Sequence, residues 1–113
     1  MPRDGVVAVK AVLESNGVAI EVSDAEILLA IKEIAEKEGI FSEPAAATSF
    51  AGFKKLRQEN KIKNNEIAVC LLTGNGLKDI DSAMKIAGEP ILIKPEIEEV
   101  KKLLDKKSNN CII

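Results

Sequence analysis

The stretch Ile67-Ala-Val-Cys-Leu-Leu-Thr73, followed by Gly74-Asn-Gly76, is the strongest fold signal in this 113-residue chain. The run has the length of a strand and is apolar at nearly every position. Such runs are typical of the centre of a parallel sheet, where helices cover both faces. The apolar runs at 18–22 and 90–94 predict two further strands. We therefore expect a sheet built largely from parallel strands.

Helical patterns surround these strands, at residues 4–16, 23–39, 44–56, 80–87 and 95–107. The clearest local signal is the pair Ser23 and Glu26, which has the spacing of a capping box. Gly39 is placed to end that helix, and Pro44 suits the first turn of the next one. Because parallel strands need helical crossovers, the pattern predicts an α/β fold of three αβα layers with a mostly parallel sheet. Residues 1–113 are expected to form a single domain.

Composition excludes several classes of function. The net charge of -2 and the absence of Trp and Tyr disfavour nucleic acid as a partner. No apolar run reaches the roughly 18 residues that span a bilayer, so no membrane segment and a cytoplasmic location are expected. The chain has no histidine and two cysteines, Cys70 and Cys111, which excludes the usual zinc sites and histidine-dependent catalysis. Cys70 is expected to be a buried small hydrophobe.

The loop after the most buried predicted strand is the first candidate site. In α/β sheets, ligands bind beyond the carboxyl ends of the strands. Thr73 would present a hydroxyl there, while Gly74 and Gly76 would allow a ligand to approach the backbone closely. The alternative is that Asn75 and Gly76 simply form a turn, and spacing alone favours that alternative.

The segment Glu43-Pro44-Ala45-Ala46-Ala47 is the second candidate site. A helix start followed by small residues can admit a ligand, and a carboxylate there is favoured by the helix dipole. The alternative is a helix cap combined with close helix packing, which spacing alone again favours.

Together the two motifs resemble the fold-type II pyridoxal-phosphate (PLP) enzymes, which are related to the tryptophan synthase β chain. This family carries a Glu-Pro-Ala segment, here Glu43–Ala45, and a few tens of residues later a strand ending in Thr-Gly or Ser-Gly, here Thr73-Gly74. The continuation Asn75–Asp79 is most similar to threonine synthases rather than to cysteine synthases or serine/threonine dehydratases. The resemblance runs from about Val6 to Asp79. It implies a C-terminal fragment within the large PLP-binding domain of such an enzyme.

The resemblance also implies roles for individual residues. The Thr73 hydroxyl would hydrogen-bond the pyridine nitrogen of PLP, and Glu43 with the small residues after it would line the cofactor. Asn75 and Asp79 match positions that shape the loop. The cofactor-binding residues expected on these grounds are Thr73, Glu43, Ala45, Gly74 and Asn75. The Schiff-base lysine and the phosphate-binding loop lie in earlier sequence in this family, and neither pattern occurs here. We therefore expect no catalytic residue in this chain and no stable PLP binding by it alone.

The activity implied for the parent enzyme is a lyase reaction of threonine biosynthesis. It converts O-phosphohomoserine and water to threonine and phosphate, with PLP as the electron sink. The expected partners are the remainder of the parent chain, this small-molecule substrate and further copies in a homo-oligomer. Two alternatives stay open: a fragment of a serine/threonine dehydratase-like PLP enzyme, and a non-catalytic stand-alone αβα binding or regulatory module.

Overall fold

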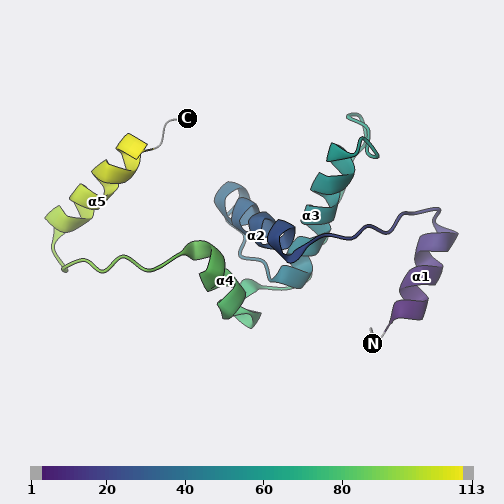
Figure 1. Ribbon diagram of the computed structural model, residues 1–113, viewed down its shortest axis with the longest axis horizontal. Coiled ribbons are helices and arrows are strands. Elements are labelled where there is room, and N and C mark those ends of the chain that lie inside the picture. The colour runs from purple at the N-terminus through teal and green to yellow at the C-terminus, as the bar shows by residue number, and fades with distance from the viewer. Residues whose placement is uncertain (1–3, 111–113) are drawn as a thin grey trace.

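The computed structural model describes residues 4–110, and helices dominate that part of the chain (Figure 1). The helices are α1 Gly5–Glu14, α2 Asp24–Glu38, α3 Pro44–Gln58, the short 3-10 helix η1 Gly76–Lys78, α4 Ile80–Ala87 and α5 Ile97–Asn110. Every predicted helix is present, with ends that differ by a few residues. Cys111 lies outside the described residues.

The start and the end of α2 follow from local sequence signals. The Ser23 amide donates a hydrogen bond to Glu26 Oε2 at 2.6 Å, and the Glu26 amide donates to Ser23 Oγ at 3.3 Å. This confirms the predicted capping box. Gly39 ends the helix in a left-handed conformation with φ 67°, where the missing Cβ atom removes the steric cost.

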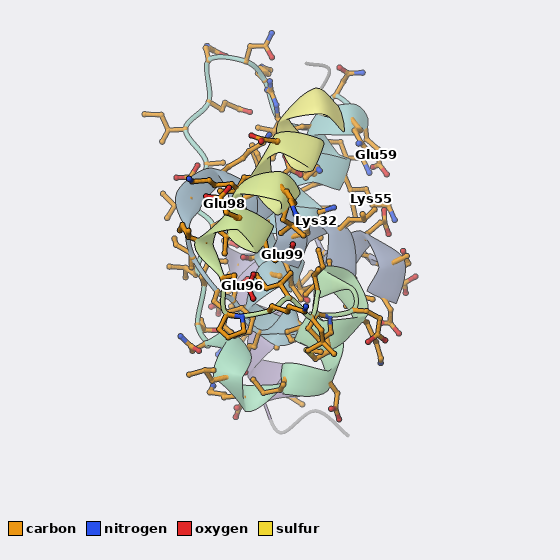
Figure 2. The ribbon with its side chains drawn as sticks, turned by 90° about the vertical axis from the view of Figure 1, so that its left-hand side faces the viewer. Lys32, Lys55, Glu59, Glu96, Glu98 and Glu99 are labelled. Carbon is orange, nitrogen blue, oxygen red and sulfur yellow. The ribbon has the colours of Figure 1, made fainter. Side chains whose placement is uncertain are left out.

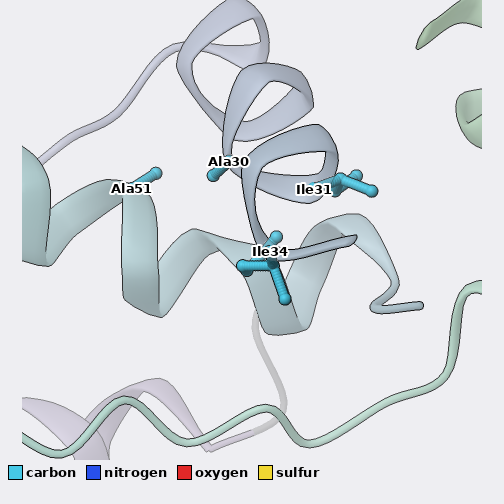
Figure 3. Close-up of a cluster of buried hydrophobic side chains, with 5 residues drawn as sticks. Ala30, Ile31, Ile34 and Ala51 are labelled. Atoms are coloured by element: carbon cyan, nitrogen blue, oxygen red, sulfur yellow. The ribbon is translucent and has the colours of Figure 1, made fainter. Parts of the chain in front are cut away.

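The core lies between α2 and α3, which pack against each other. Figure 3 shows Ala30 of α2 facing Ala51 of α3, with Ile34 beside them. Small alanine side chains on both helices let the two backbones approach closely. Val22 and Leu72 pack against the edge of this cluster, so the predicted strand segments 18–22 and 67–73 touch it. The buried cluster consists of Ala30, Ile31, Ile34, Ala47 and Ala51.

The predicted sheet does not form within residues 4–110. Segments 18–22, 67–73 and 90–94 carry no strand there, and the β-type pairing consists of one antiparallel bridge between Ser42 and Asn75. A strand is stable only when neighbouring strands satisfy its backbone N–H and C=O groups. No backbone hydrogen bond joins the three segments to one another in this part of the chain.

The segment Ile67–Thr73 nevertheless has the alternation of a strand with one covered face. Cys70 and Leu72 are half-buried and face the helices. Ile67, Val69 and Leu71 are 95%, 80% and 70% exposed, respectively. One face of the segment therefore lies on the helix pair, and the other face is bare.

The molecule is extended. Its radius of gyration is 18.5 Å, whereas a compact domain of this length has about 13 Å. Helix α5 lies at one end of the molecule and α1 at the other (Figure 1).

Figure 2 shows Glu98 and Glu99 on α5, where they form ion pairs with Lys101 and Lys102 at 2.9 and 3.1 Å, respectively. Within residues 4–110, none of the helices has the length and apolarity needed to cross a bilayer.

Candidate functional site

Two backbone hydrogen bonds bring the predicted site motifs together. The Glu43 amide donates to the Gly74 carbonyl at 3.1 Å, and the Gly76 amide donates to the Phe41 carbonyl at 3.0 Å. Between them lies the antiparallel bridge of Ser42 and Asn75. The start of α3 and the loop after residue 73 are therefore one structural unit, although about thirty residues separate them in sequence.

Both glycines of this unit lie where another side chain comes close to the backbone. A Cβ atom at Gly74 would lie 1.7 Å from Glu43 Oε1, and one at Gly76 would lie 2.3 Å from Phe41 Cε2. The loop also contains the turn that the sequence left open as an alternative. Asn75 caps η1 by accepting a hydrogen bond from the Leu77 amide at 2.9 Å. The loop thus forms the turn and also lets the side chains of Glu43 and Phe41 lie close to its backbone.

The start of α3 combines packing with an outward-facing residue. Ala46 and Ala47 are buried at 1% and 0% exposure, which confirms close helix packing at these two positions. Ala45 is exposed. Glu43 is the N-cap residue, its side chain is 17% exposed, and its Oε1 lies 3.3 Å from Lys78 Nζ. The small residues therefore divide into a packed pair and one residue on the outer side of the helix start.

Thr73 lies at the start of the loop and is exposed. Within residues 4–110, no hydrogen bond engages its hydroxyl group, so the group is available to a ligand. Thr73 carries an exposed hydroxyl, Glu43 a carboxylate and Ala45 an exposed small side chain, and these are the chemical groups that the sequence motifs place near the loop. The sequence contains no glycine-rich phosphate loop, so these residues offer no group for a phosphate.

Asp79 closes the loop at its far end. It caps α4 by accepting hydrogen bonds from the Ser82 amide at 3.0 Å and the Ser82 hydroxyl at 2.8 Å. These bonds hold the pKa of Asp79 below its ordinary value. Asn75 and Asp79 thus cap the two short helices of the loop, η1 and α4.

Sequence reasoning gave no role to three neighbours of the site. Phe41 covers Gly76, and Lys78 reaches back to Glu43. Ser42 is 1% exposed, and its Oγ has no hydrogen-bond partner. No pattern in the sequence pairs Glu43 with Lys78, because 35 residues separate them and the chain carries many other charges of both signs.

Other chemical candidates lie away from this unit. Cys70 is half-buried, and burial raises the pKa of its thiol, which makes it a poor nucleophile. A groove of about 490 Å³ lies between α2 and α4, with Ile31, Phe41 and Met84 among its lining residues, and it includes none of the five predicted cofactor residues. Among the described residues, no group of His, Cys, Asp and Glu side chains is arranged to hold a metal ion.

Comparison with known proteins establishes the class of this chain. Residues 1–74 match the family described as "Pyridoxal-phosphate dependent enzyme", and this match covers more than half of the chain. The chain therefore belongs to the PLP-dependent enzyme family, whose cofactor is pyridoxal phosphate. The matched region ends at Gly74, so it includes both the Glu43–Ala45 motif and Thr73.

The most specific similarity is to threonine synthases. The chain is 46% identical to the enzyme of Methanocaldococcus jannaschii over 103 residues, which cover 91% of this chain and 25% of that protein. It is 44% identical to the enzyme of Halalkalibacterium halodurans over 98 residues, covering 87% of this chain and 28% of that protein. The threonine synthase of Synechocystis is 45% identical over 93 residues. The chain thus spans about a quarter of the length of these curated relatives.

Proposed function

We propose that this chain is the C-terminal part of a threonine synthase and forms one wall of its PLP site. The whole enzyme would convert O-phosphohomoserine and water to threonine and phosphate. The observation that carries the proposal is the Ser42–Asn75 bridge, which unites the two motifs typical of the family. The names of the relatives favour this reaction over that of a serine/threonine dehydratase.

Within this wall, Thr73 would donate or accept a hydrogen bond at the pyridine nitrogen of PLP. Glu43 and Ala45 would line the ring, and Gly74 and Asn75 would hold the loop in place. PLP supplies an electron sink when it is bound. A neutral hydroxyl cannot keep the ring nitrogen protonated as a carboxylate would, so Thr73 suits elimination and replacement chemistry.

The remaining parts of the enzyme would complete the fold. Segments 18–22 and 67–73 would become strands of the parallel sheet once neighbouring strands pair with their edges. A stand-alone αβα module has less support, because such a module needs a sheet within the chain itself and residues 4–110 contain none. A single domain, a cytoplasmic location and a homo-oligomeric state belong to the same proposal.

The test is a chimera in which this chain replaces the homologous quarter of the M. jannaschii enzyme. In that chimera, Thr73→Val keeps the shape of the side chain but leaves a ring nitrogen unpaired, at a cost of about 1–3 kcal/mol. We expect weaker PLP retention and turnover lower by roughly tenfold or more. Thr73→Ser keeps the hydroxyl and should retain most of the activity.

Two outcomes would count against the proposal. If Thr73→Val retains PLP and turns over like the parent chimera, the hydroxyl is not a cofactor contact. The isolated chain, assayed in parallel with PLP and O-phosphohomoserine, should form no threonine. Threonine formation by the isolated chain would show that it carries catalytic residues of its own.

A further inference from the structure

We infer that Lys78 is a positioning residue for the cofactor loop. Its ammonium group holds the Glu43 carboxylate, and through Glu43 it fixes the loop that carries Thr73 against the start of α3. The functional meaning of this contact rests on the proposed role of Thr73, but the contact itself is a property of the structure.

The ion pair places the carboxylate directly over the loop. Lys78 Nζ lies 3.3 Å from Glu43 Oε1, which is the same oxygen that would lie 1.7 Å from a Cβ atom at Gly74. The Lys78 side chain is 63% exposed, whereas that of Glu43 is 17% exposed. Solvent therefore screens the lysine end more than the carboxylate end, and the carboxylate is held against Gly74.

Three contacts connect Glu43, the loop and Lys78 in a cycle. Glu43 bonds to the Gly74 carbonyl through its amide, and the Lys78 amide bonds to the Asn75 carbonyl at 3.2 Å. The Lys78–Glu43 ion pair completes the cycle that runs from Glu43 through Gly74 and Asn75 to Lys78. Within the described part of the chain, no other cation pairs with Glu43. Thr73 is exposed and directly precedes Gly74, whose carbonyl is held by the Glu43 amide.

Amide hydrogen exchange of the 113-residue chain, measured residue by residue, tests this positioning role without PLP. The reporters are the amides of Glu43 and Gly76, which bridge the two site segments. Lys78→Met keeps the apolar stem and removes the charge, so both amides should exchange about three- to fivefold faster. Lys78→Arg restores the charge and should restore slow exchange. Lys32→Met removes a surface ion pair within α2 and is the matched control that should leave both reporters unchanged.

Three results would overturn the inference. The exchange rates of the two reporter amides could be unchanged in Lys78→Met, or they could rise equally in Lys78→Met and Lys78→Arg. Alternatively, Lys78→Met could accelerate exchange of core amides, such as that of Ile34, as much as that of the reporters. The last would show a general loss of stability. Failure here is distinguishable from failure of the proposed function. If Thr73→Val has no effect on PLP retention or turnover, the proposed cofactor contact of Thr73 is refuted. The effect of Lys78→Met on amide exchange would still be observed.

Discussion

At the scale of single residues, Gly74 beside α3 and Gly52 within α3 have opposite roles. A Cβ atom at Gly74 would collide with the Glu43 side chain, at 1.7 Å from Oε1. A Cβ atom at Gly52 would meet only Ile20 Cγ2, at an ordinary contact distance of 3.5 Å. Gly74 therefore leaves room for the Glu43 carboxylate, whereas Gly52 is a glycine inside a helix, where alanine is favoured by about 1 kcal/mol.

This contrast predicts opposite effects of the same substitution. Gly74→Ala forces the Glu43 carboxylate away from Lys78 and should lower the free energy of unfolding by about 1 kcal/mol. Gly52→Ala should raise it by up to about 1 kcal/mol. Urea unfolding followed by far-UV circular dichroism measures both changes. A Gly74→Ala variant as stable as the parent would mean that the carboxylate has other equally good positions.

At the scale of elements, the capping box of α2 makes the stability of the fold depend on pH. The Ser23 amide, and then the Ser23 hydroxyl, hold the pKa of Glu26 below its ordinary value of 4.5 by hydrogen bonding to the ionised carboxylate. A carboxyl group with a lowered pKa in the folded state stabilises the fold fully above its unfolded pKa. That stabilisation is lost as the pH falls through the lowered folded value.

Glu26→Gln keeps the shape of the cap but removes the charge. The parent chain should therefore be more stable than Glu26→Gln at neutral pH, and the difference should vanish as the pH falls below the lowered pKa of Glu26. Urea unfolding at a series of pH values measures this difference. Ser23→Ala removes the other half of the cap and should cost about 1 kcal/mol at neutral pH. A difference that stays constant down to acid pH would exclude the ionised carboxylate as the cause.

At the scale of the whole molecule, too much apolar surface is exposed for a closed monomer. The accessible surface is 9531 Å², whereas a compact protein of this mass has about 6100 Å². Part of the excess is the bare face of Ile67, Val69 and Leu71. Apolar patches of this kind mark surfaces that pair with another protein surface.

The isolated chain should therefore self-associate. Sedimentation should give a mean mass that rises with concentration above 12.2 kDa, and an apolar dye should bind. Val69→Lys places a charge on the bare face and should reduce both effects. Ala68 precedes Val69 and does not belong to the set Ile67, Val69 and Leu71, so Ala68→Lys is the control and should reduce them less. A strict monomer at high concentration, without dye binding, would contradict this prediction.

The helices were predictable from the sequence because their signals are local. The capping box at Ser23, the stop at Gly39 and the proline at position 44 each act within one helical turn, so the sequence alone sets where α2 and α3 begin and where α2 ends. The motif residues were also visible in the sequence, through their resemblance to the PLP enzymes.

The sheet and the assembly of the site depend on contacts between segments far apart in sequence. The run Ile67–Thr73 has the composition of a buried strand, but hydrogen-bonding neighbours decide whether it becomes one, and residues 4–110 supply none. No local pattern reports that Asn75 pairs with Ser42, or that Lys78 reaches Glu43. The helices and the candidate residues can be recognised from sequence patterns because they depend on near neighbours in the chain. Which of these residues meet depends on how the chain folds back on itself, and that is visible in the three-dimensional structure alone.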